Sequence, residues 1–535
     1  MPKLCKVTVL YRHSRIYTGD PQRPYATGLL ADDDVILAIG DFESLAVQHR
    51  EATVVELGGA LVLPGMHDAH IHTASLAREL AALDLRRVTT LEQALQHVQQ
   101  YAETIPSGAW IMGGRWDSNK WTPPGQPTRH DLDRVSGDHP VALASIDGHT
   151  MWVNTAALSA VGITFDTPDP AGGVIARDDQ GSPTGILREA ACEAVERVYA
   201  SPVSGDLADQ LAAAQEHLLS VGLTSVTDLD GEDARAAYLR MKSDGWLNIR
   251  VTKGIPVTHL DAAIAEGRRS GDGDDWLRVG PVKLFSDGAL GSHTCHMSHG
   301  FRGDESNHGM PVLSHEQVLA YARRATDAGI AVATHAIGDQ AAHTVLGAYE
   351  QLRAETGTSM TLSIEHSQFL QPDDVHRMAQ LGVTASMQPT HCTSDITLCE
   401  AMLPDSPLVA YGWRTLLDAG VAVAFGSDAP VEDPNPFFGL HAAVTRQRFD
   451  GTPAGGWQPH ERVTINEAIA AHTAGSARLT GDFTRKGRLT AGRLADFIAI
   501  DTDITDPELI ADEPLRIRTA QVLQTVVGGE TRWSR

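Results

Sequence analysis

The feature that most constrains this chain is a series of eight short apolar segments between residues 60 and 428, each ending in polar residues. Helical stretches separate most of them, for example residues 315–329 and 372–382. Strands that alternate with helices pair in parallel, so closure into a TIM (β/α)₈ barrel of the α/β class is the simplest prediction. An open doubly wound sheet is the alternative. The predicted strands are ALVLPGM (60–66), GLTSVTD (222–228), NIRVTK (248–253), PVKLFSD (281–287), IAVATHA (330–336), TLSIEHS (361–367), GVTASMQ (382–388) and VAVAFGSD (421–428).

The two ends of the chain carry short strand patterns of another kind, rich in β-branched residues and closed by turns. We therefore predict a composite β-sandwich from residues 1–63 and 484–535, and a barrel over residues 64–483. The segment from about residue 84 to residue 205 separates the first two barrel strands and is too long for an ordinary crossover. Because they hold Gly, Pro and Trp clusters and a hairpin pattern at 172–189, we expect an inserted lid or substrate subdomain.

Composition excludes several classes of partner. The formal net charge is −25, which argues against nucleic acid and anionic membranes, because phosphate binding needs clustered Lys and Arg. No run of about 18 apolar residues and no signal-peptide pattern occurs, and the five cysteines form no CxxC pair. We expect a reduced, cytoplasmic protein that acts on a small molecule and forms a homodimer.

Ionisable side chains recur at the carboxyl ends of the predicted strands, which is where barrel active sites lie. His70 and His72 follow the first strand two residues apart, so both imidazoles point to the same side of an extended segment. Each such residue alone is explained as easily by a cap or a buried hydrogen bond. Six of them on five strands favour a metal site; the other four are Lys283, His335, His366 and Asp428.

The ligand types narrow the metal. Imidazole nitrogens with a carboxylate oxygen suit Zn²⁺, with Mn²⁺, Fe²⁺, Co²⁺ or Ni²⁺ as alternatives, and the absence of thiolates from the set indicates a catalytic and not a structural site. We expect one or two divalent cations with an open position for water or substrate.

The sequence resembles the amidohydrolase superfamily, and more narrowly the YtcJ-like amidohydrolases that include N-substituted formamide deformylase. The resemblance spans nearly the whole chain. One departure is His67, where the family usually has an aliphatic residue. The matching segments are PGMHDAHIH (64–72), GGRWD (113–117), DGHTMWVNTAAL (147–158), GSPTGILRE (181–189), VKLFSDGALGSHT (282–294), ATHAIGD (333–339), IEHSQ (364–368), FGSDAPVEDPNP (425–436) and GRLTAGRLADFIAID (487–501).

This resemblance implies a role for each matched position. His70, His72 and Asp428 would bind the more buried metal, and His335 and His366 a second one. Lys283 would bridge the two as N6-carboxylysine, which requires a neutral amine and therefore a desolvated site. An unmodified Lys283 with a single metal is the alternative.

The expected mechanism is attack of metal-bound hydroxide on a carbonyl. Asp428 would accept the proton of the water and pass it to the leaving nitrogen. His149 is a candidate for holding the oxyanion. Asp287 would orient Lys283 or a ligand, or else simply form a turn.

Substrate contacts are predicted from aromatic and loop residues. Trp116 and Phe285, with Trp121 and Trp152, are candidates to line an apolar pocket, and each is equally explained as a core aromatic. Asp117 belongs to the matching GGRWD segment and is placed with the substrate-binding candidates. His293 lies in a Gly-rich segment, residues 288–300, that we predict to gate the site.

The predicted function is hydrolysis of a non-peptide C–N bond in a linear amide, an N-acyl or N-formyl amine. Deamination of a cyclic amidine is the alternative, but those enzymes commonly place a Glu three residues after the fifth-strand histidine, and here the stretch is HAIGD, with Asp339 one position later. Ester or lactone hydrolysis would use the same site. A catalytically silent regulator is expected to lack a ligand, and all six positions are filled.

Overall fold

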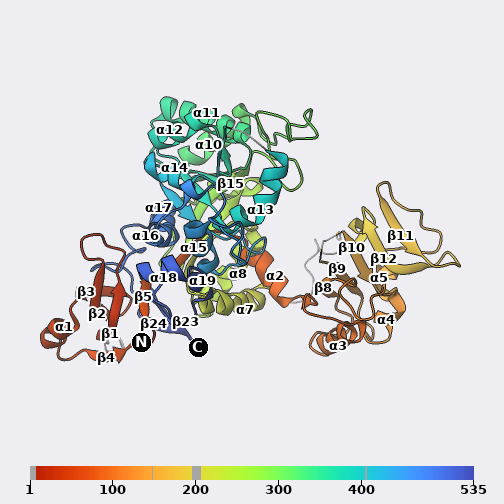
Figure 1. Ribbon diagram of the computed structural model, residues 1–535, viewed down its shortest axis with the longest axis horizontal. Helices are drawn as coiled ribbons and strands as arrows, with labels where there is room; N and C mark the ends of the chain where they lie inside the picture. Colours follow the sequence, from red (N-terminus) through yellow and green to blue (C-terminus); the bar gives the residue numbers. More distant parts are fainter. Residues whose placement is uncertain (1–7, 147–148, 196–205, 404–406) are drawn as a thin grey trace. The chain divides into compact units, whose positions relative to one another are not determined.

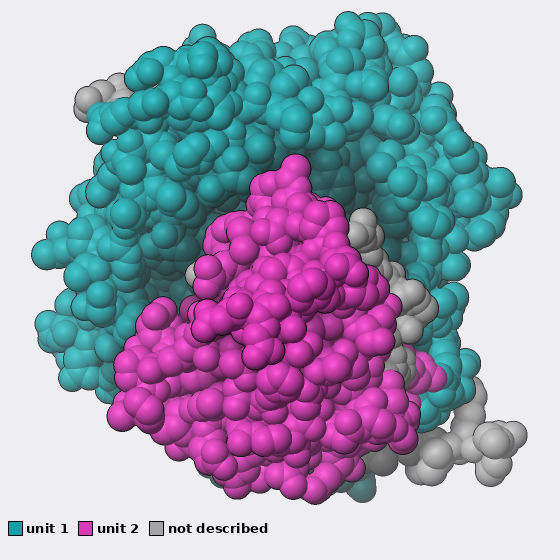
Figure 2. Space-filling model, turned by 90° about the vertical axis from the view of Figure 1, so that its right-hand side faces the viewer, with its two compact units in different colours: residues 1–75, 211–535 teal, residues 76–210 magenta. Residues whose placement is uncertain are grey.

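The computed structural model describes residues 8–146, 149–195, 206–403 and 407–535. The chain divides into two compact units, coloured separately in Figure 2: residues 1–75 with 211–535, and residues 76–210. The insertion predicted at about 84–205 falls within the second unit. Among the described residues no helix is long and apolar enough to cross a membrane.

The first unit contains the predicted barrel. Eight parallel strands are hydrogen-bonded side by side in chain order, and the last strand returns to the first. The closing hydrogen bonds run from Asp428 N to His70 O, at 2.7 Å, and from His72 N to Ala429 O, at 2.9 Å. The strands are β6 (Met66–Ile71), β13 (Leu223–Asp228), β14 (Arg250–Pro256), β15 (Leu277–Phe285), β16 (Val332–Ala336), β17 (Leu362–His366), β19 (Thr384–Met387) and β21 (Val423–Phe425).

The barrel strands are buried because helices cover their outer face and side chains fill the interior. Every residue of β6, β13 and β17 is buried. The helices begin and end on recognisable signals: Ser314 and Gln317 form a capping box, and Gly357 and Gly382 end their helices in left-handed conformation. The helices that follow the strands are α8 (Glu232–Ser243), α9 (Leu260–Ala265), α10 (His315–Asp327), α11 (Asp339–Thr356), α12 (Pro372–Leu381), α13 (Pro389–Met402), α14 (Trp413–Asp418), α15 (Pro436–Thr445), α16 (Ile465–Ala470) and α17 (Ser476–Leu479).

The first barrel strand was predicted too early in the chain. Residues 60–66 divide at Gly65: the segment before it, β5 (Leu61–Pro64), pairs with the terminal sheet, and β6 begins at Met66. The apolar run therefore serves two sheets in succession. As a result the HDAHIH segment forms most of the strand and does not follow it.

Both ends of the chain contribute strands to one sheet, and Figure 1 shows the red and dark blue strands side by side. β22 pairs with β5, so the C-terminal strands continue the N-terminal ones. Tyr11 and Phe497 pack edge to face in its core, with ring centroids 4.9 Å apart. The other strands are β1 (Thr8–Tyr17), β2 (Tyr25–Asp32), β3 (Val35–Gly40), β4 (Thr53–Glu56), β22 (Phe497–Ile500), β23 (Val522–Val527) and β24 (Glu530–Ser534), with helices α1 (Phe42–Gln48), α18 (Pro507–Asp512) and α19 (Leu515–Thr519).

The second unit has a mixed six-stranded sheet of its own. Its last two strands form the hairpin predicted at 172–189, in antiparallel register. The strands are β7 (Leu83–Asp84), β8 (Ile111–Trp116), β9 (Val141–Ser145), β10 (Thr150–Val153), β11 (Gly173–Arg177) and β12 (Pro183–Glu189), and helices α3 (Leu91–Ala102), α4 (Arg129–Asp133) and α5 (Thr155–Ala160) accompany them. Helices α2 (Thr73–Ala81) and α7 (Leu207–Ser220) each span a boundary between the units.

Candidate metal centre

His70 of β6, His72 directly after this strand and the aspartate that follows β21 meet at the carboxyl ends of the barrel strands. Asp428 Oδ1 lies 3.4 Å from His70 Nε2 and 3.3 Å from His72 Nε2. Tetrahedral ligands with bonds of 2.0–2.1 Å, as Zn²⁺ prefers, lie roughly 3.3–3.4 Å apart. The three side chains are therefore spaced as ligands of one small cation, and His70 is almost completely buried.

The outer nitrogen of each of these imidazoles is held by a carboxylate. His70 Nδ1 donates to Glu365 Oε2 at 2.8 Å, and His72 Nδ1 donates to Asp230 Oδ1 at 3.2 Å. In a neutral imidazole such a contact keeps the proton on Nδ1, so that Nε2 can bind a metal. Neither carboxylate was singled out from the sequence, although Glu365 directly precedes the predicted ligand His366.

Asp68 aligns the two ligand-bearing segments. Its Oδ1 accepts from the backbone N–H groups of His70 and Ser427, at 3.1 and 3.0 Å, and its Oδ2 accepts from the Ser427 hydroxyl. The strands pass so closely here that a Cβ on Gly426 would lie 2.5 Å from His70 N. The glycine and Ser427 of the FGSD segment thus place Asp428 beside the histidines, and sequence reasoning missed Asp68.

Lys283 projects from β15 into the same cluster, with Nζ 3.4 Å from His70 Nε2. Its side chain is buried, and burial lowers the pKa of the Lys283 amine, with Glu365 and Asp428 opposing the shift. A lowered pKa is what carboxylation by CO₂ requires, since only the neutral amine reacts.

His335 and His366, from β16 and β17, lie next to each other with ring centroids 4.5 Å apart. Gln388 Oε1 accepts from His366 Nδ1 at 3.0 Å, which turns Nε2 of His366 toward Asp428. His335 is held differently, because its Nε2 donates to the carbonyl of Gly288 at 3.1 Å. His366 and Asp428 have φ of 75° and 59°, values rare outside glycine and concentrated at functional sites.

A further histidine, His391 at the start of α13, completes the cluster and was missed from the sequence. Its Nε2 lies 3.9 Å from Asp428 Oδ2, and its ring stacks on that of His366 at 6.1 Å. Because His391 follows no predicted strand directly, the strand-end argument could not find it. The sequence offered one signal for His391: it lies in the first turn of the helix that begins at Pro389, directly after the seventh strand.

Burial and neighbouring charges shift the pKa values of the side chains in this cluster. Burial and the nearby Lys283 lower the pKa of His70 to about 4. Burial also acts to lower the pKa of His72, but hydrogen bonds to Asp230 and Asp428 outweigh it and raise the value to about 9. Burial opposes ionisation of Asp428, yet the surrounding histidines hold its pKa well below the ordinary value. The carboxylate is therefore ionised and available as a ligand.

The cluster lines a cavity of about 360 Å³, large enough for a small organic substrate. Phe285 forms part of the wall and is 45% exposed, and its ring centroid lies 5.2 Å from Lys283 Nζ; its contact with substrate stays a prediction. Asp395 and Glu432 supply two more carboxylates to the lining.

The structure shows the surroundings of two further candidates, Trp116 and Asp287. Trp116 is 3% exposed, packs against Trp121 and Trp152 in the core of the second unit, and donates its indole N–H to Leu143 O; packing and not binding explains it. Asp287 accepts from the backbone N–H groups of His296, Ile337 and Gly338, and its Oδ1 lies 3.4 Å from His335 Nε2. It therefore joins the loops after β15 and β16 and steadies His335, and it is buried away from the cavity.

The remaining candidates lie outside the cluster. His293 has a φ of 55°, its ring lies tilted against that of Phe301 with centroids 5.4 Å apart, and it is absent from the described cavity lining. His149 and Asp117 belong to the second unit, where His149 Nδ1 lies 3.1 Å from Glu189 Oε2 and Asp117 Oδ2 lies 3.3 Å from Lys120 Nζ. Their roles in oxyanion and substrate binding remain predictions.

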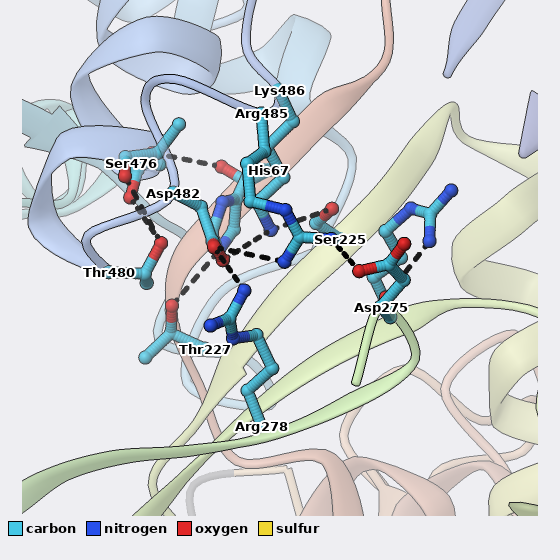
Figure 3. A network of polar contacts seen from close by, with 12 residues as sticks. His67, Ser225, Thr227, Asp275, Arg278, Ser476, Thr480, Asp482, Arg485 and Lys486 are labelled. Atoms are coloured by element: carbon cyan, nitrogen blue, oxygen red, sulfur yellow. Dashed lines mark hydrogen bonds and ion pairs between the residues drawn. The ribbon is translucent and has the colours of Figure 1, made fainter. Parts of the chain in front are cut away.

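His67, the departure from the family pattern, is not part of the metal cluster. Its Nε2 lies 2.9 Å from Thr227 Oγ1, in a polar network at the amino ends of the strands (Figure 3). The same network contains Lys486, whose Nζ lies 3.2 Å from Ser225 Oγ, and the ion pair of Asp482 with Arg278 at 2.7 Å. The extra imidazole therefore supports the barrel from the opposite end.

A barrel that gathers imidazoles and an ionised carboxylate around one cavity defines the class of metal-dependent hydrolases, and the donor set fits divalent cations of the zinc type. Residues 53–532 match the family described as "Amidohydrolase family", and the chain belongs to it. It is an enzyme of the hydrolase class that acts on C–N bonds.

Similar proteins cover nearly the whole chain. The "Protein LONG AFTER FAR-RED 3" of Arabidopsis thaliana is 32% identical over 98% of this chain and 91% of its own length. The putative amidohydrolase YtcJ of Bacillus subtilis is 31% identical, over 96% and 97%. The N-substituted formamide deformylase of Arthrobacter pascens is 28% identical, over 98% of both. A crystal structure of an uncharacterized metal-dependent hydrolase from Pyrococcus furiosus aligns with a TM-score of 0.78 at 28% identity, covering 93% of this chain and 100% of that one. These findings confirm the resemblance inferred from the motifs.

Proposed function

We propose that this enzyme hydrolyses a linear amide, an N-acyl or N-formyl amine, with Zn²⁺ as its cation. The observation that carries the proposal is the meeting of His70, His72 and ionised Asp428 at the spacing of a tetrahedral site, open to a cavity. A cation held there activates water and polarises a carbonyl oxygen. The name of the Arthrobacter relative, N-substituted formamide deformylase, describes a reaction of this kind.

Asp428 is the residue that we assign to proton transfer. It lies within hydrogen-bonding reach of the ligand nitrogens, and its oxygens face the cavity. A carboxylate in this place can take the proton from the attacking water and give it to the leaving nitrogen. Carboxylation of Lys283 belongs to the same proposal, because its amine is buried, has a lowered pKa and touches His70.

Deamination of a cyclic amidine is disfavoured by the position of Asp339. This carboxylate, one residue beyond the position at which deaminases commonly carry the Glu, is buried at the start of α11. Its oxygens accept from Ser298 N and Gln371 Nε2, both at 3.0 Å, and it is not among the described lining residues. Asp339 therefore stabilises the segments that contain Ser298 and Gln371 and does not face the substrate.

The two carboxylates beyond the metal cluster favour a neutral or cationic substrate group at their side of the cavity. Asp395 and Glu432 line it beyond the metal cluster, whereas Lys283, at its base, is the sole Lys or Arg among the described lining residues. Glu432 accepts from Ser394 Oγ at 2.6 Å, which holds its carboxylate in place. An anionic group near these two side chains would be repelled.

The experiment is a substrate panel on zinc-loaded protein with Asp428→Asn as the inactive control. The panel contains N-formyl and N-acetyl alkylamines, N-acyl amino acids, lactones and cyclic amidines, and amine, acid or ammonia is measured as product. We expect turnover of N-acyl or N-formyl amines, fastest when the N-substituent is neutral or ends in an ammonium group. Turnover confined to lactones or to cyclic amidines would refute the proposal.

The metal and Lys283 are tested on the same preparation. Elemental analysis of freshly purified protein is expected to give zinc above the other transition metals. Reloading with zinc in the presence of bicarbonate is expected to restore more activity than reloading in CO₂-free buffer, and Lys283→Ala is expected to lose that difference. Equal recovery in both buffers would contradict carboxylation.

A further inference from the structure

We propose that the cavity binds an amide with apolar groups on both sides of its C–N bond, with the acyl group against Phe285 and the amine substituent against Val431. The inference rests on the proposed amide hydrolysis and adds to it the class of substrate and its direction in the cavity. Phe285 was a candidate from the sequence, whereas Val431 was not, and the sequence assigned neither residue to one side of a substrate.

Both side chains are apolar and largely open to solvent. Phe285 is 45% exposed and Val431 is 68% exposed, and both line the cavity that contains the metal cluster. Single exposed apolar side chains are common on protein surfaces and need no explanation. Two of them in the wall of one cavity are different, because a bound ligand would remove both from water. Their burial therefore favours a ligand that carries apolar groups.

The barrel topology places these two residues on opposite sides of the cavity. Phe285 ends β15, the fourth strand, and Val431 follows β21, the eighth strand. In a closed barrel of eight strands, the fourth and eighth strands lie across from each other. A ligand that reaches both side chains therefore crosses the cavity, with its reacting bond over the metal cluster between them.

The side of the cavity at β15 and β16 is apolar beyond Phe285. Leu290 and Ile337, from the segments after these strands, also line the cavity and are buried. The ring of Phe285 lies against that of His335, with centroids 5.6 Å apart, so packing holds it on this side. A formyl group carries no carbon chain to cover Phe285, whereas a longer acyl group would cover it. This wall therefore favours an N-acyl over an N-formyl amine.

The direction of the substrate follows from Asp428. Val431 N donates to Asp428 O at 2.9 Å, so Val431 lies in the turn that directly follows the proposed proton-transfer residue. In the proposed reaction Asp428 gives a proton to the leaving nitrogen, which places the amine at this side of the cavity. Glu432, the next residue, also lines the cavity and suits an amine substituent that ends in an ammonium group. The acyl group then points toward Phe285.

The hydrophobic effect sets the size of the expected preference. Burial of one methylene group changes a binding or rate constant by about 3- to 5-fold. A wall of apolar side chains should therefore give a steady rise in kcat/KM with chain length, until the chain extends beyond the wall. A polar wall gives no such rise.

The test uses two series of amides on zinc-loaded, full-length protein. One series varies the acyl group from acetyl to octanoyl on methylamine, and the other varies the amine from methylamine to octylamine on an acetyl group. The variants are Phe285→Ala, Phe285→Leu and Val431→Ala, with Phe449→Ala and Val47→Ala as controls at exposed positions outside the described cavity lining. Calorimetric binding of the same amides to Asp428→Asn protein gives a readout that needs no turnover.

We expect kcat/KM to rise about 3- to 5-fold per methylene group in both series, in the wild type and in the two controls. Phe285→Ala should flatten the acyl series alone, and Val431→Ala should lessen the rise in the amine series alone. Phe285→Leu keeps an apolar side chain and should retain most of the acyl preference. The inference is overturned if the wild type shows no dependence on chain length, or if each Ala variant affects the opposite series.

The two proposals can fail independently. Hydrolysis of amides without regard to chain length would refute the inference and leave the proposed function intact. Hydrolysis of lactones in place of amides would refute the proposed function. A chain-length preference among lactones that Phe285→Ala removes would then still support the apolar wall at Phe285.

Discussion

Glu365 and His70, 295 residues apart in the chain, form a hydrogen bond of 2.8 Å at the base of the metal cluster, where their side chains are 2% and 1% exposed. The carboxylate determines which imidazole nitrogen faces the cavity. Glu365 also accepts from Ser363 Oγ at 2.8 Å, so it cannot rotate away without breaking a second contact. This pair links β17 to the first barrel strand.

Glu365→Gln is expected to weaken metal binding at the first position by about 10- to 100-fold, because the amide no longer fixes the tautomer of His70. Competition between the protein and a chelator of known affinity measures the change. The control is Glu350→Gln, on the exposed side of α11, which should bind metal as the wild type does. Unchanged affinity in a folded Glu365→Gln protein would contradict the role of this contact.

Asp428→Asn is expected to abolish turnover, at least about 100-fold in kcat, and to leave the protein folded. The φ of Asp428 is 59°, and Asn is among the few residues that adopt this conformation readily, so the backbone is not strained by the change. Initial rates and thermal unfolding are measured together. Parental activity in this variant would show that proton transfer has been assigned to the wrong residue.

Removal of metal is expected to abolish hydrolysis and to lower the thermal unfolding temperature. A cation that binds only the folded chain stabilises it by mass action, so its loss removes that stabilisation. The protein is dialysed against a chelator, and activity and unfolding are followed as Zn²⁺, Co²⁺ or Mn²⁺ is returned. Full activity in chelated protein that contains no residual metal would exclude the mechanism.

Acidification is expected to destabilise the protein through His472, which is buried with both ring nitrogens unpaired among the described residues. Burial lowers its pKa to about 4, against an ordinary value of about 6.5. As pH falls, the unfolded chain therefore binds the proton before the folded chain does. The contribution of His472 to the free energy of unfolding is fully present above pH 6.5 and is lost as pH falls toward 4. The shift corresponds to about 3 kcal/mol. The free energy of unfolding, measured in urea across this pH range, should depend less steeply on pH in His472→Gln than in the wild type.

Breaking the buried ion pair of Arg250 with Asp496 is expected to cost about 3–5 kcal/mol of unfolding free energy. The guanidinium of β14 makes two hydrogen bonds to the carboxylate, at 2.7 and 2.9 Å, next to the terminal sheet. Arg250→Ala leaves an unpaired buried carboxylate, whereas the double variant Arg250→Met/Asp496→Leu removes both charges. Equilibrium denaturation should find the double variant more stable than the single one.

Much of the fold was predictable because apolar periodicity is local. The eight barrel strands, the hairpin at 172–189 and the strands at both ends follow from runs of a few residues. The boundary at Gly65 was not predictable, since one apolar run supplies strands to two sheets, and only the pairing partners separate them.

The sequence by itself determined that His70, His72, Lys283, His335, His366 and Asp428 come together, because the carboxyl ends of parallel barrel strands share one rim. Only the tertiary structure decided which nitrogen of each ring faces the cavity, that Glu365 and Asp230 hold the first pair, and that His391 lies beside Asp428. Orientation depends on hydrogen bonds between segments hundreds of residues apart, and no local pattern of residues records them.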